Sequence, residues 1–320
     1  MKKILIIRFS SIGDIVLTTP VIRCIKEQKP EIEIHYLTKK SFKGILEHNP
    51  YLSKIHTIEK DINEIATELK QENFDYVIDL HNNLRSLQTK RIIGKPSSSF
   101  KKLNFKKWML VNLKINNMPA MHVVDRYLET AAALGIKNDL KGLDYFIPTK
   151  DEVQLQSLPS THQNGYIGFV IGAKHFTKQL PTEKIIAICK KLNQPIVLLG
   201  GKEDKERAIK IEKAVGSNIY NACGNYNLNQ SASLIKQAKK IITHDTGLMH
   251  IAAAFKKEII SVWGNTVPAF GFTPYLPDSK SKIVEVKNLA CRPCSKIGHD
   301  KCPKGHFKCM MEIDENEFIN

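Results

Sequence analysis

The chain has 320 residues, of which 42% are apolar and 25% are charged, with 17 Gly and 14 Pro. This balance excludes a disordered or collagen-like chain and supplies enough apolar residues for a packed core. No run of about 18 apolar residues predicts a transmembrane helix, and the apolar stretch Ile4–Ile7 is too short for a signal peptide. We therefore expect a cytosolic protein of one large or two medium domains.

The charge is strongly positive, because 48 Lys and Arg stand against 32 Asp and Glu, a net charge of +16. Such a charge favours anionic partners: nucleic acid, an anionic membrane surface or phosphorylated small molecules. Much of the excess falls between Asp79 and Asp125, where no acidic residue occurs. The cations of this stretch are Arg85, Lys90, Arg91, Lys95, Lys101, Lys102, Lys106, Lys107 and Lys114. They form either a solvated basic face or a landing surface for an anionic partner.

Short apolar runs alternate with helical patterns in both halves of the chain. The runs predict strands at Ile4–Ile7, Ile32–Leu37, Lys54–Ile58, Tyr76–Leu80, Tyr166–Ile171, Pro195–Leu199, Ile219–Asn221, Lys240–Thr243 and Glu258–Val262. The periodic segments predict helices at Ile15–Glu27, Ile62–Gln71, Thr182–Leu192, Lys205–Val215, Asn229–Ala238 and Leu248–Ala254. This alternation is typical of parallel sheets covered on both faces.

The pattern therefore predicts an α/β chain of two Rossmann-like, doubly wound domains, residues 1–155 and 156–320. The polar segment Lys150–Asn164, with Pro159 near its centre, is the expected linker. Ligands are expected at the carboxyl ends of the strands, in a cleft between the two domains.

Two strand-to-helix turns carry candidate chemistry. Arg8–Asp14 follows the first strand, and Asp14 either caps the next helix or accepts a proton from a sugar hydroxyl. The dinucleotide fingerprint G-x-G-x-x-G is absent there. His244–His250 combines small Thr246 and Gly247 with a helix start, which either is an ordinary cap or binds phosphate through free N–H groups.

Two further loops of the second half are weaker candidates. In Gly172–Pro181, Lys174 and Lys178 could neutralise a diphosphate or be solvated surface lysines. In Gly200–Asp204, Glu203 could accept hydrogen bonds from ribose hydroxyls, or the segment could be an exposed turn.

Four of the seven cysteines crowd into the C-terminal region. They are Cys291, Cys294, Cys302 and Cys309. Because disulfides do not persist in a reducing cytosol, they are either reduced thiols or ligands of a structural Zn²⁺ or iron ion. Four protein ligands would leave such a metal no open position for catalysis.

Taken together, these motifs resemble glycosyltransferase family 9, the ADP-heptose:lipopolysaccharide heptosyltransferases. The resemblance runs over nearly the whole chain. Its carriers are Arg8–Asp14 with Thr19-Pro20, Asp79–Ser86, the Gly172–Pro181 loop, Asp245–His250 and the terminal cysteine pattern. One position departs from the family, whose loop usually reads Lys-Arg-Trp-Pro where this chain has Lys178-Gln179-Leu180-Pro181.

The resemblance implies a GT-B fold and an inverting transfer of a heptose or related sugar from an ADP-sugar to a lipopolysaccharide-core-type acceptor. It implies Asp14 as the catalytic base. The implied donor-binding residues are Lys178, Thr177, Glu203, Asp245, Thr246, Gly247 and His250. The implied acceptor-binding residues are Arg8, Ser10, Arg85 and Ser86.

No Asp-x-Asp triplet occurs, so we expect metal-independent transfer in which protein cations stabilise the leaving diphosphate, with no cofactor required for catalysis. The acceptor would be an anionic, lipid-linked saccharide, which predicts a cytoplasmic enzyme in peripheral contact with the inner membrane.

The sequence leaves two alternative functions open. A nucleotide-sugar epimerase or hydrolase of the same fold would act on the donor without an acceptor. A nucleic-acid-binding protein would use the positive charge, but the basic stretch has few aromatic residues, namely Phe100, Phe105 and Trp108. We therefore expect no nucleic-acid partner.

Overall fold

The computed structural model describes residues 2–319, which form two compact α/β units. Of the described residues, one unit comprises 2–102 and Met121–Phe146, and the other comprises Leu103–Ala120 and 147–319. This division differs from the one expected at residue 155, because residues 103–120 and 147–155 group with the second unit. The segment expected to be a linker packs against that unit: the Val153 N–H donates to Ser233 Oγ, and Asp151 is buried.

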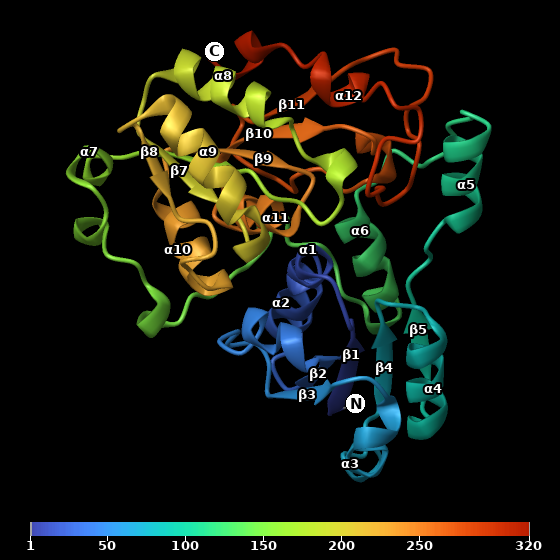
Figure 1. The fold of residues 1–320 in the computed structure, drawn as a ribbon. Coiled ribbons are helices and arrows are strands. Elements are labelled where there is room, and N and C mark those ends of the chain that lie inside the picture. The colour runs from blue at the N-terminus through green and yellow to red at the C-terminus, as the bar shows by residue number, and fades with distance from the viewer. Residues whose placement is uncertain (1, 320) are drawn as a thin grey trace. The chain divides into compact units, whose positions relative to one another are not determined.

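Five parallel strands form the first sheet, in the order β3-β2-β1-β4-β5 (Figure 1). They are β1 (Lys3–Ile7), β2 (Glu33–Lys39), β3 (Lys54–Ile58), β4 (Tyr76–Asp79) and β5 (Ser97–Ser99). The first four match the predicted strands closely. Strand β5 was not predicted, because three serines at a sheet edge carry no apolar run.

Six parallel strands form the second sheet, in the order β11-β10-β9-β6-β7-β8. They are β6 (Ile167–Val170), β7 (Ile196–Leu199), β8 (Ile219–Asn221), β9 (Lys240–His244), β10 (Glu258–Trp263) and β11 (Lys282–Glu285). Counted within this unit, the order is that of a Rossmann sheet, and the first sheet has the same order with one strand fewer. The predicted fold of two doubly wound parallel sheets is confirmed.

The helices of the first unit cover its sheet. They are α1 (Ile12–Val16), α2 (Thr19–Gln28), α3 (Ala66–Gln71), α4 (Leu84–Ile93) and α6 (Val123–Leu128), with the 3₁₀ helices η1 (Lys40–Ile45), η2 (Ile62–Ile65) and η3 (Glu129–Leu134). The single helix predicted over residues 15–27 is wrong. It is divided between α1 and α2, because Pro20 in the first turn of α2 has no N–H to continue the preceding helix.

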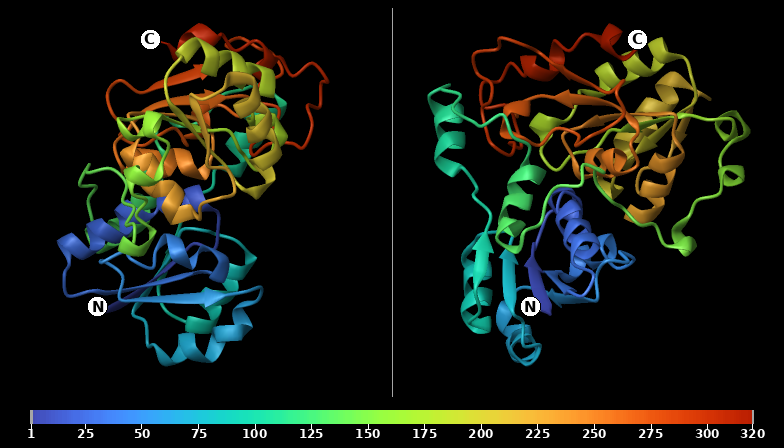
Figure 2. Two further views of the ribbon diagram at one scale, coloured as in Figure 1. Left: turned by 60° about the vertical axis from the view of Figure 1, so that its left-hand side comes forward. Right: turned by 180° about the vertical axis from the view of Figure 1, so that it is seen from behind.

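The second unit has helices on both faces of its sheet (Figures 1 and 2). They are α5 (Asn104–Asn112), α7 (Ser160–Gln163), α8 (Thr182–Leu192), α9 (Lys205–Val215), α10 (Leu228–Gln237), α11 (Gly247–Ala254) and α12 (Lys308–Met311). The 3₁₀ helices are η4 (Thr149–Asp151), η5 (Leu155–Ser157), η6 (Phe176–Lys178), η7 (Lys202–Asp204), η8 (Pro268–Phe270) and η9 (Glu315–Phe318). Helices α8 and α9 pack together, as do α10 and α11. Right-handed crossovers put these pairs on opposite faces, because the chain reverses its direction across the sheet after β8.

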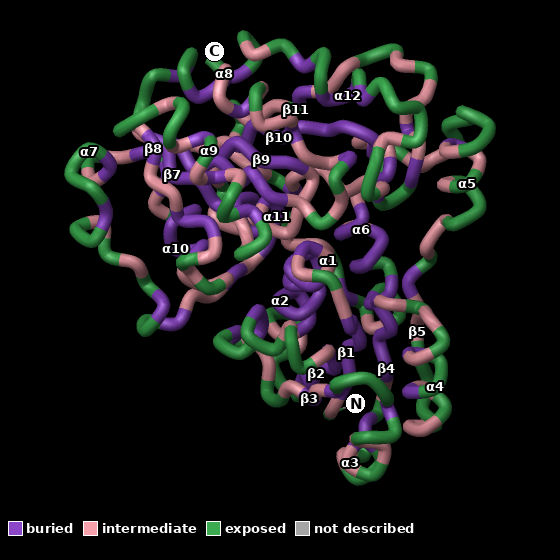
Figure 3. Tube along the Cα trace, viewed as in Figure 1, coloured by how far each residue is buried: buried purple, intermediate pink, exposed green. Residues whose placement is uncertain are grey.

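The strands carry the core of each unit, and their traces are mostly buried in Figure 3. In the first unit, Leu5, Leu37 and Phe74 belong to one apolar cluster. In the second, Phe169 and Ile242 from adjacent strands belong to another. Within residues 2–319, no helix is long and apolar enough to cross a membrane.

Candidate active site

The candidate residues gather where each sheet reverses the direction of its connections. In the first sheet this switch point lies between β1 and β4, and in the second it lies between β6 and β9. Residues 8–14 and 80–86 follow the first pair of strands, and residues 171–181 and 245–250 follow the second pair. Doubly wound sheets bind ligands at this position, outside the carboxyl ends of the strands.

Asp14 is the third residue of α1, and two neighbours hold its carboxylate. The Ser11 N–H and hydroxyl donate to Oδ2 at 3.2 and 2.7 Å, and Arg8 Nη2 lies 2.6 Å from Oδ1. The Ser11 contacts form a capping box, so Asp14 caps its helix as one interpretation of the spacing predicts. The side chain is still 24% exposed, so a solvent-borne group can reach a carboxylate whose position is fixed.

Arg8 is the buried cation that holds this carboxylate. Its Nε donates to the Ser10 carbonyl at 2.7 Å, and its Nη1 donates to the Leu80 carbonyl at 2.6 Å. Burial opposes the charge, but the Tyr127 and Asp14 side chains outweigh it and raise the pKa of the guanidinium. Two Arg8 nitrogens thus bind backbone carbonyls and the third binds Asp14. Arg8 is therefore fixed in place and orients the carboxylate.

The two predicted residues at the start of α4 have different environments. The Arg85 guanidinium lies over the Phe9 ring, 5.3 Å from its centroid, and is partly exposed. Ser86 is fully buried; its N–H donates to Asn83 Oδ1, and its hydroxyl accepts from the Asn83 N–H. The Ser86 side chain therefore caps α4 and positions Arg85 at the sheet edge.

In the second unit, an ion pair spans the switch point. Lys178 Nζ lies 2.5 Å from Asp245 Oδ2 and also donates to the Asp245 carbonyl at 3.3 Å. The Thr266 hydroxyl donates to the same carboxylate at 2.9 Å. Lys178 and Asp245 are only 16% and 13% exposed, so the pair is mostly shielded from water.

Helix α11 begins directly beside this pair. Its N-cap is Thr246, whose side chain makes no capping hydrogen bond and lies 3.5 Å from the Thr243 hydroxyl. The first-turn N–H groups, beginning at Gly247, are therefore left without a side-chain cap. Together with the helix dipole, such groups favour an anion. His250 is buried at the fourth helical position.

A buried histidine fastens the Lys178 loop to β9. His244 Nε2 accepts the Leu180 N–H at 2.9 Å, which requires the ring to be neutral at that nitrogen. Burial, followed by the charge of Arg207, lowers the pKa of His244 to about 3. Leu180 itself is buried, and Arg207 Nη1 donates to Gln179 Oε1 at 2.9 Å. Internal packing thus accounts for both residues that depart from the family loop.

Two predicted donor residues lie outside this cluster of contacts. Thr177 is 1% exposed, and its hydroxyl exchanges hydrogen bonds with the backbone of His299, so it ties the loop to the cysteine-rich segment. Glu203 is exposed in the 3₁₀ helix η7. The neighbouring Asp204 is buried instead and accepts the Gly201 N–H at 2.9 Å.

Three residues at this edge of the sheet were missed from the sequence. Asp204 packs against Gly172, where a Cβ would collide with its carboxylate. Thr266 binds Asp245, and Asn265 beside it is buried with no hydrogen-bond partner for its side-chain amide among the described residues. A bound ligand or water normally satisfies such an amide. For Asn265 and Thr266, the sequence offers one indication of a functional role, namely that they follow β10, the strand next to β9.

The four C-terminal cysteines are free thiols. Burial and then repulsion among the neighbouring thiols raise the pKa of Cys294 and Cys309, that of Cys309 to about 12. The groups are thus near enough to influence one another. Within residues 2–319, however, no three of their sulfur atoms lie within 4.8 Å of one another. The donor type suits Zn²⁺ or iron, but the sulfurs are not gathered at ligand spacing.

Two doubly wound parallel sheets, each with polar groups at its switch point, place the chain in the GT-B class of fold. The family model for glycosyltransferase family 9 (heptosyltransferase) matches residues 62–304, most of the chain. The chain belongs to this family and is a glycosyltransferase.

A curated relative is similar to this chain in sequence, and two solved structures share its fold. Lipopolysaccharide heptosyltransferase 1 of Campylobacter coli is 28% identical over 288 residues, which cover 82% of this chain and 84% of that protein. The structure of E. coli ADP-heptose lps heptosyltransferase II aligns with a TM-score of 0.72 at 22% identity, covering 97% of this chain and 98% of the other. An E. coli heptosyltransferase with ADP-2-deoxy-2-fluoro heptose aligns with a TM-score of 0.67 at 21% identity. This alignment covers 88% of the present chain and 92% of the other.

The His244 environment predicts a pH dependence of stability. Its folded pKa of about 3 lies below the ordinary value near 6.5, so the unfolded chain binds more protons as the pH falls. The stability that comes from keeping His244 neutral is fully present above about pH 6.5 and is lost as the pH falls towards 3. Between pH 7 and pH 5 the free energy of unfolding should decrease by about 2 kcal/mol for this reason. The H244Q variant should lose stability less steeply over this range in denaturant titrations, whereas parallel curves for the two proteins would contradict the assignment.

Proposed function

We propose that the protein transfers a heptose from an ADP-sugar to a lipopolysaccharide-core-type acceptor, with inversion at the anomeric carbon. The first unit would bind the acceptor beside Asp14, and the second would bind the donor at Lys178 and the start of α11. The supporting observation is that the carboxylate and the anion-binding groups each lie at a Rossmann switch point. The heptosyltransferases similar to this chain support the choice of sugar and nucleotide.

In the proposed reaction Asp14 acts as general base. The acceptor hydroxyl gives its proton to the Asp14 carboxylate while its oxygen forms a bond to the anomeric carbon. The bond between that carbon and the diphosphate oxygen breaks on the opposite face, and ADP leaves with the electron pair. Arg8 and Ser11 support this role, since they hold the carboxylate in one orientation, and orientation is a large part of such catalysis.

Negative charge grows on the leaving diphosphate in the transition state. Lys178 and the N–H groups that begin at Gly247 would stabilise it, and preorganised donors of this kind contribute strongly to catalysis. Asp245 would position Lys178 until the diphosphate competes for it. We propose that these protein groups serve where other transferases use a divalent ion, so that transfer needs no bound metal. Thr246 and His250 would shape the same subsite, and Arg85 with Ser10 would meet the acceptor.

The D14N substitution distinguishes the two roles of Asp14, general base and helix cap. Turnover should fall by about 10²–10⁴ because the general base is removed, while affinity for ADP stays unchanged. Steady-state kinetics with both substrates saturating, together with ADP titration, measure the two quantities. The matched control is D61N, which alters a capping carboxylate of the same unit and should change turnover by less than about twofold. Normal turnover of the D14N variant would contradict the proposed role.

We also propose that the enzyme acts at the cytoplasmic face of the inner membrane through α5 and its flanks. The rings of Phe105 and Trp108 are stacked, with centroids 6.2 Å apart, and are 72% and 51% exposed. Lys101 and Lys106, which are near these aromatic residues in the sequence, are exposed. Exposed aromatic side chains next to lysines suit an anionic lipid surface, which an anionic, lipid-linked acceptor would require.

Vesicle binding tests this surface. The double variant K101E/K106E should bind vesicles containing anionic phospholipid at least about tenfold more weakly, because each lysine near the surface contributes about 1 kcal/mol. Reversal of two exposed lysines of α9, K210E/K213E, changes the net charge equally and should have little effect. Equal losses in both variants, or none in the first, would contradict the proposal. Sedimentation with large vesicles measures the affinity.

For the cysteine-rich segment we propose a structural Zn²⁺ or iron ion held by Cys291, Cys294, Cys302 and Cys309. Binding would have to draw the four sulfurs closer together and deprotonate them. Elemental analysis of the purified protein should find this metal, and C291S/C294S should contain less of it than the wild type, whereas the core variant C24A should contain as much as the wild type. Equal metal content in the wild type and in C291S/C294S would contradict this assignment.

A further inference from the structure

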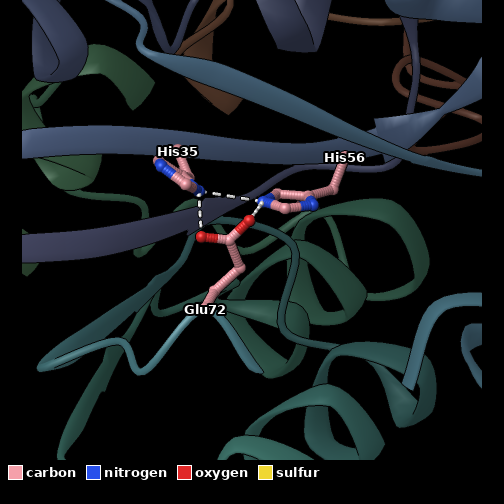
Figure 4. Close-up of side chains that lie close together, drawn as sticks. All are labelled: His35, His56 and Glu72. Carbon is pink, nitrogen blue, oxygen red and sulfur yellow. Dashed lines mark hydrogen bonds and ion pairs between the residues drawn. The ribbon is translucent and has the colours of Figure 1, made fainter. Parts of the chain in front are cut away.

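A second cluster of side chains lies at the opposite end of the first sheet from Asp14. His35 is near the start of β2, His56 is on the adjacent strand β3, and Glu72 follows α3 (Figure 4). Among the described residues, it is the one group of three His, Cys, Asp or Glu side chains whose ligand atoms lie within 4.8 Å of one another. Both histidines are almost completely buried.

The outer nitrogen of each histidine faces a carboxylate. His35 Nε2 lies 2.8 Å from Glu33 Oε1, and His56 Nδ1 lies 2.8 Å from Glu68 Oε1. An ionised carboxylate only accepts hydrogen bonds, so both outer nitrogens carry the protons. This carboxylate–histidine arrangement is the one that orients metal-ligating imidazoles and fixes their tautomer.

The inner nitrogens therefore present lone pairs to each other. His35 Nδ1 and His56 Nε2 are 2.9 Å apart, and in neutral rings neither of them has a proton to donate. Two lone pairs at this distance repel unless a cation lies between them. Because the outer nitrogens carry the protons, the space between His35 Nδ1 and His56 Nε2 is a favourable position for a cation.

Glu72 supplies a third ligand atom facing the same position. Its oxygens lie 3.7 Å from His35 Nδ1 and 4.0 Å from His56 Nε2. A tetrahedral ion with bonds of about 2.0–2.1 Å separates its ligand atoms by about 3.3 Å, so none of the three distances needs to change by more than about 0.7 Å. Lys3 and Lys54 also bind Glu72, but a carboxylate has lone pairs for several partners.

The surrounding charges also favour a cation. Three carboxylates, those of Glu33, Glu68 and Glu72, stand against the two lysines, which leaves one negative charge uncompensated. Glu33 and Glu68 are 47% and 42% exposed, so an ion can enter past them although the histidines are buried.

We propose that His35, His56 and Glu72 bind a divalent transition-metal ion, Zn²⁺ foremost, that clamps β2, β3 and the end of α3. Two imidazoles and one carboxylate suit Zn²⁺ far better than Mg²⁺ or Ca²⁺, which take oxygen ligands. The site lies at the amino ends of the strands, whereas Asp14 follows their carboxyl ends. The ion is therefore structural, and the inference does not depend on the proposed transfer reaction.

Diffraction from crystals of the full chain soaked in ZnCl₂ tests the site directly. Anomalous difference maps at the zinc edge should show a peak about 2 Å from His35 Nδ1 and His56 Nε2. Wild-type crystals suffice, so the test does not require a variant to fold. A map without a peak there, including one with a peak only at the cysteines, would overturn the proposal and leave a proton as the shared cation.

Thermal unfolding and cobalt absorption test the site in solution. In the C291S/C294S background, which removes two of the cysteines proposed to bind metal, saturating ZnCl₂ should raise the melting temperature by about 5 °C, and CoCl₂ should give a tetrahedral visible spectrum without thiolate charge-transfer bands. H56Q removes one ligand and should abolish both effects, while H48Q changes an exposed histidine of the same unit and should retain them. Equal responses in H56Q and H48Q would contradict the assignment.

Discussion

The direction of the strand connections determines where this protein can do chemistry. In each sheet, two neighbouring parallel strands send their connections to opposite faces, so the loops separate and leave the carboxyl ends open. Segments far apart in the sequence meet there for the same reason. Lys178 and Asp245 are 67 residues apart and touch because they follow β6 and β9. In the first unit, Arg8 follows β1 and binds the carbonyl of Leu80, which follows β4.

The ion pair of the second unit has a cost as well as a benefit. A lysine shielded from water requires an opposite charge, and Asp245 supplies it together with a hydrogen bond from Thr266. The same carboxylate competes with any anionic ligand for Lys178. A diphosphate carries more charge than one carboxylate, and the donor that we propose would also reach the uncapped N–H groups of α11. It would therefore make more interactions at this edge than Asp245 makes with Lys178.

The fold class and the positions of nine strands could be predicted, because short apolar runs that alternate regularly with helical segments are typical of parallel α/β sheets. The edge strands β5 and β11 were missed, since Ser97–Ser99 and Lys282–Glu285 carry little apolar signal. The direction in which individual side chains point was harder to predict from the sequence. Glu203 and Asp204 are adjacent in the sequence, and only the fold shows that Asp204 is the buried carboxylate. The contact between His35 and His56 depends on the register of β2 and β3, in which His35 lies opposite Lys54 and His56 opposite Leu37. The spacing alone does not specify this register.

We propose that the β6–β9 edge binds the diphosphate of the donor. Calorimetric titration with ADP tests it most directly on the wild type, on K178Q and on K174Q, whose lysine is exposed in the same loop. The loss of a charge-assisted hydrogen bond should weaken ADP binding to K178Q about 10- to 100-fold. K174Q should bind as the wild type does. Equal ADP affinity in K178Q and the wild type would contradict the account.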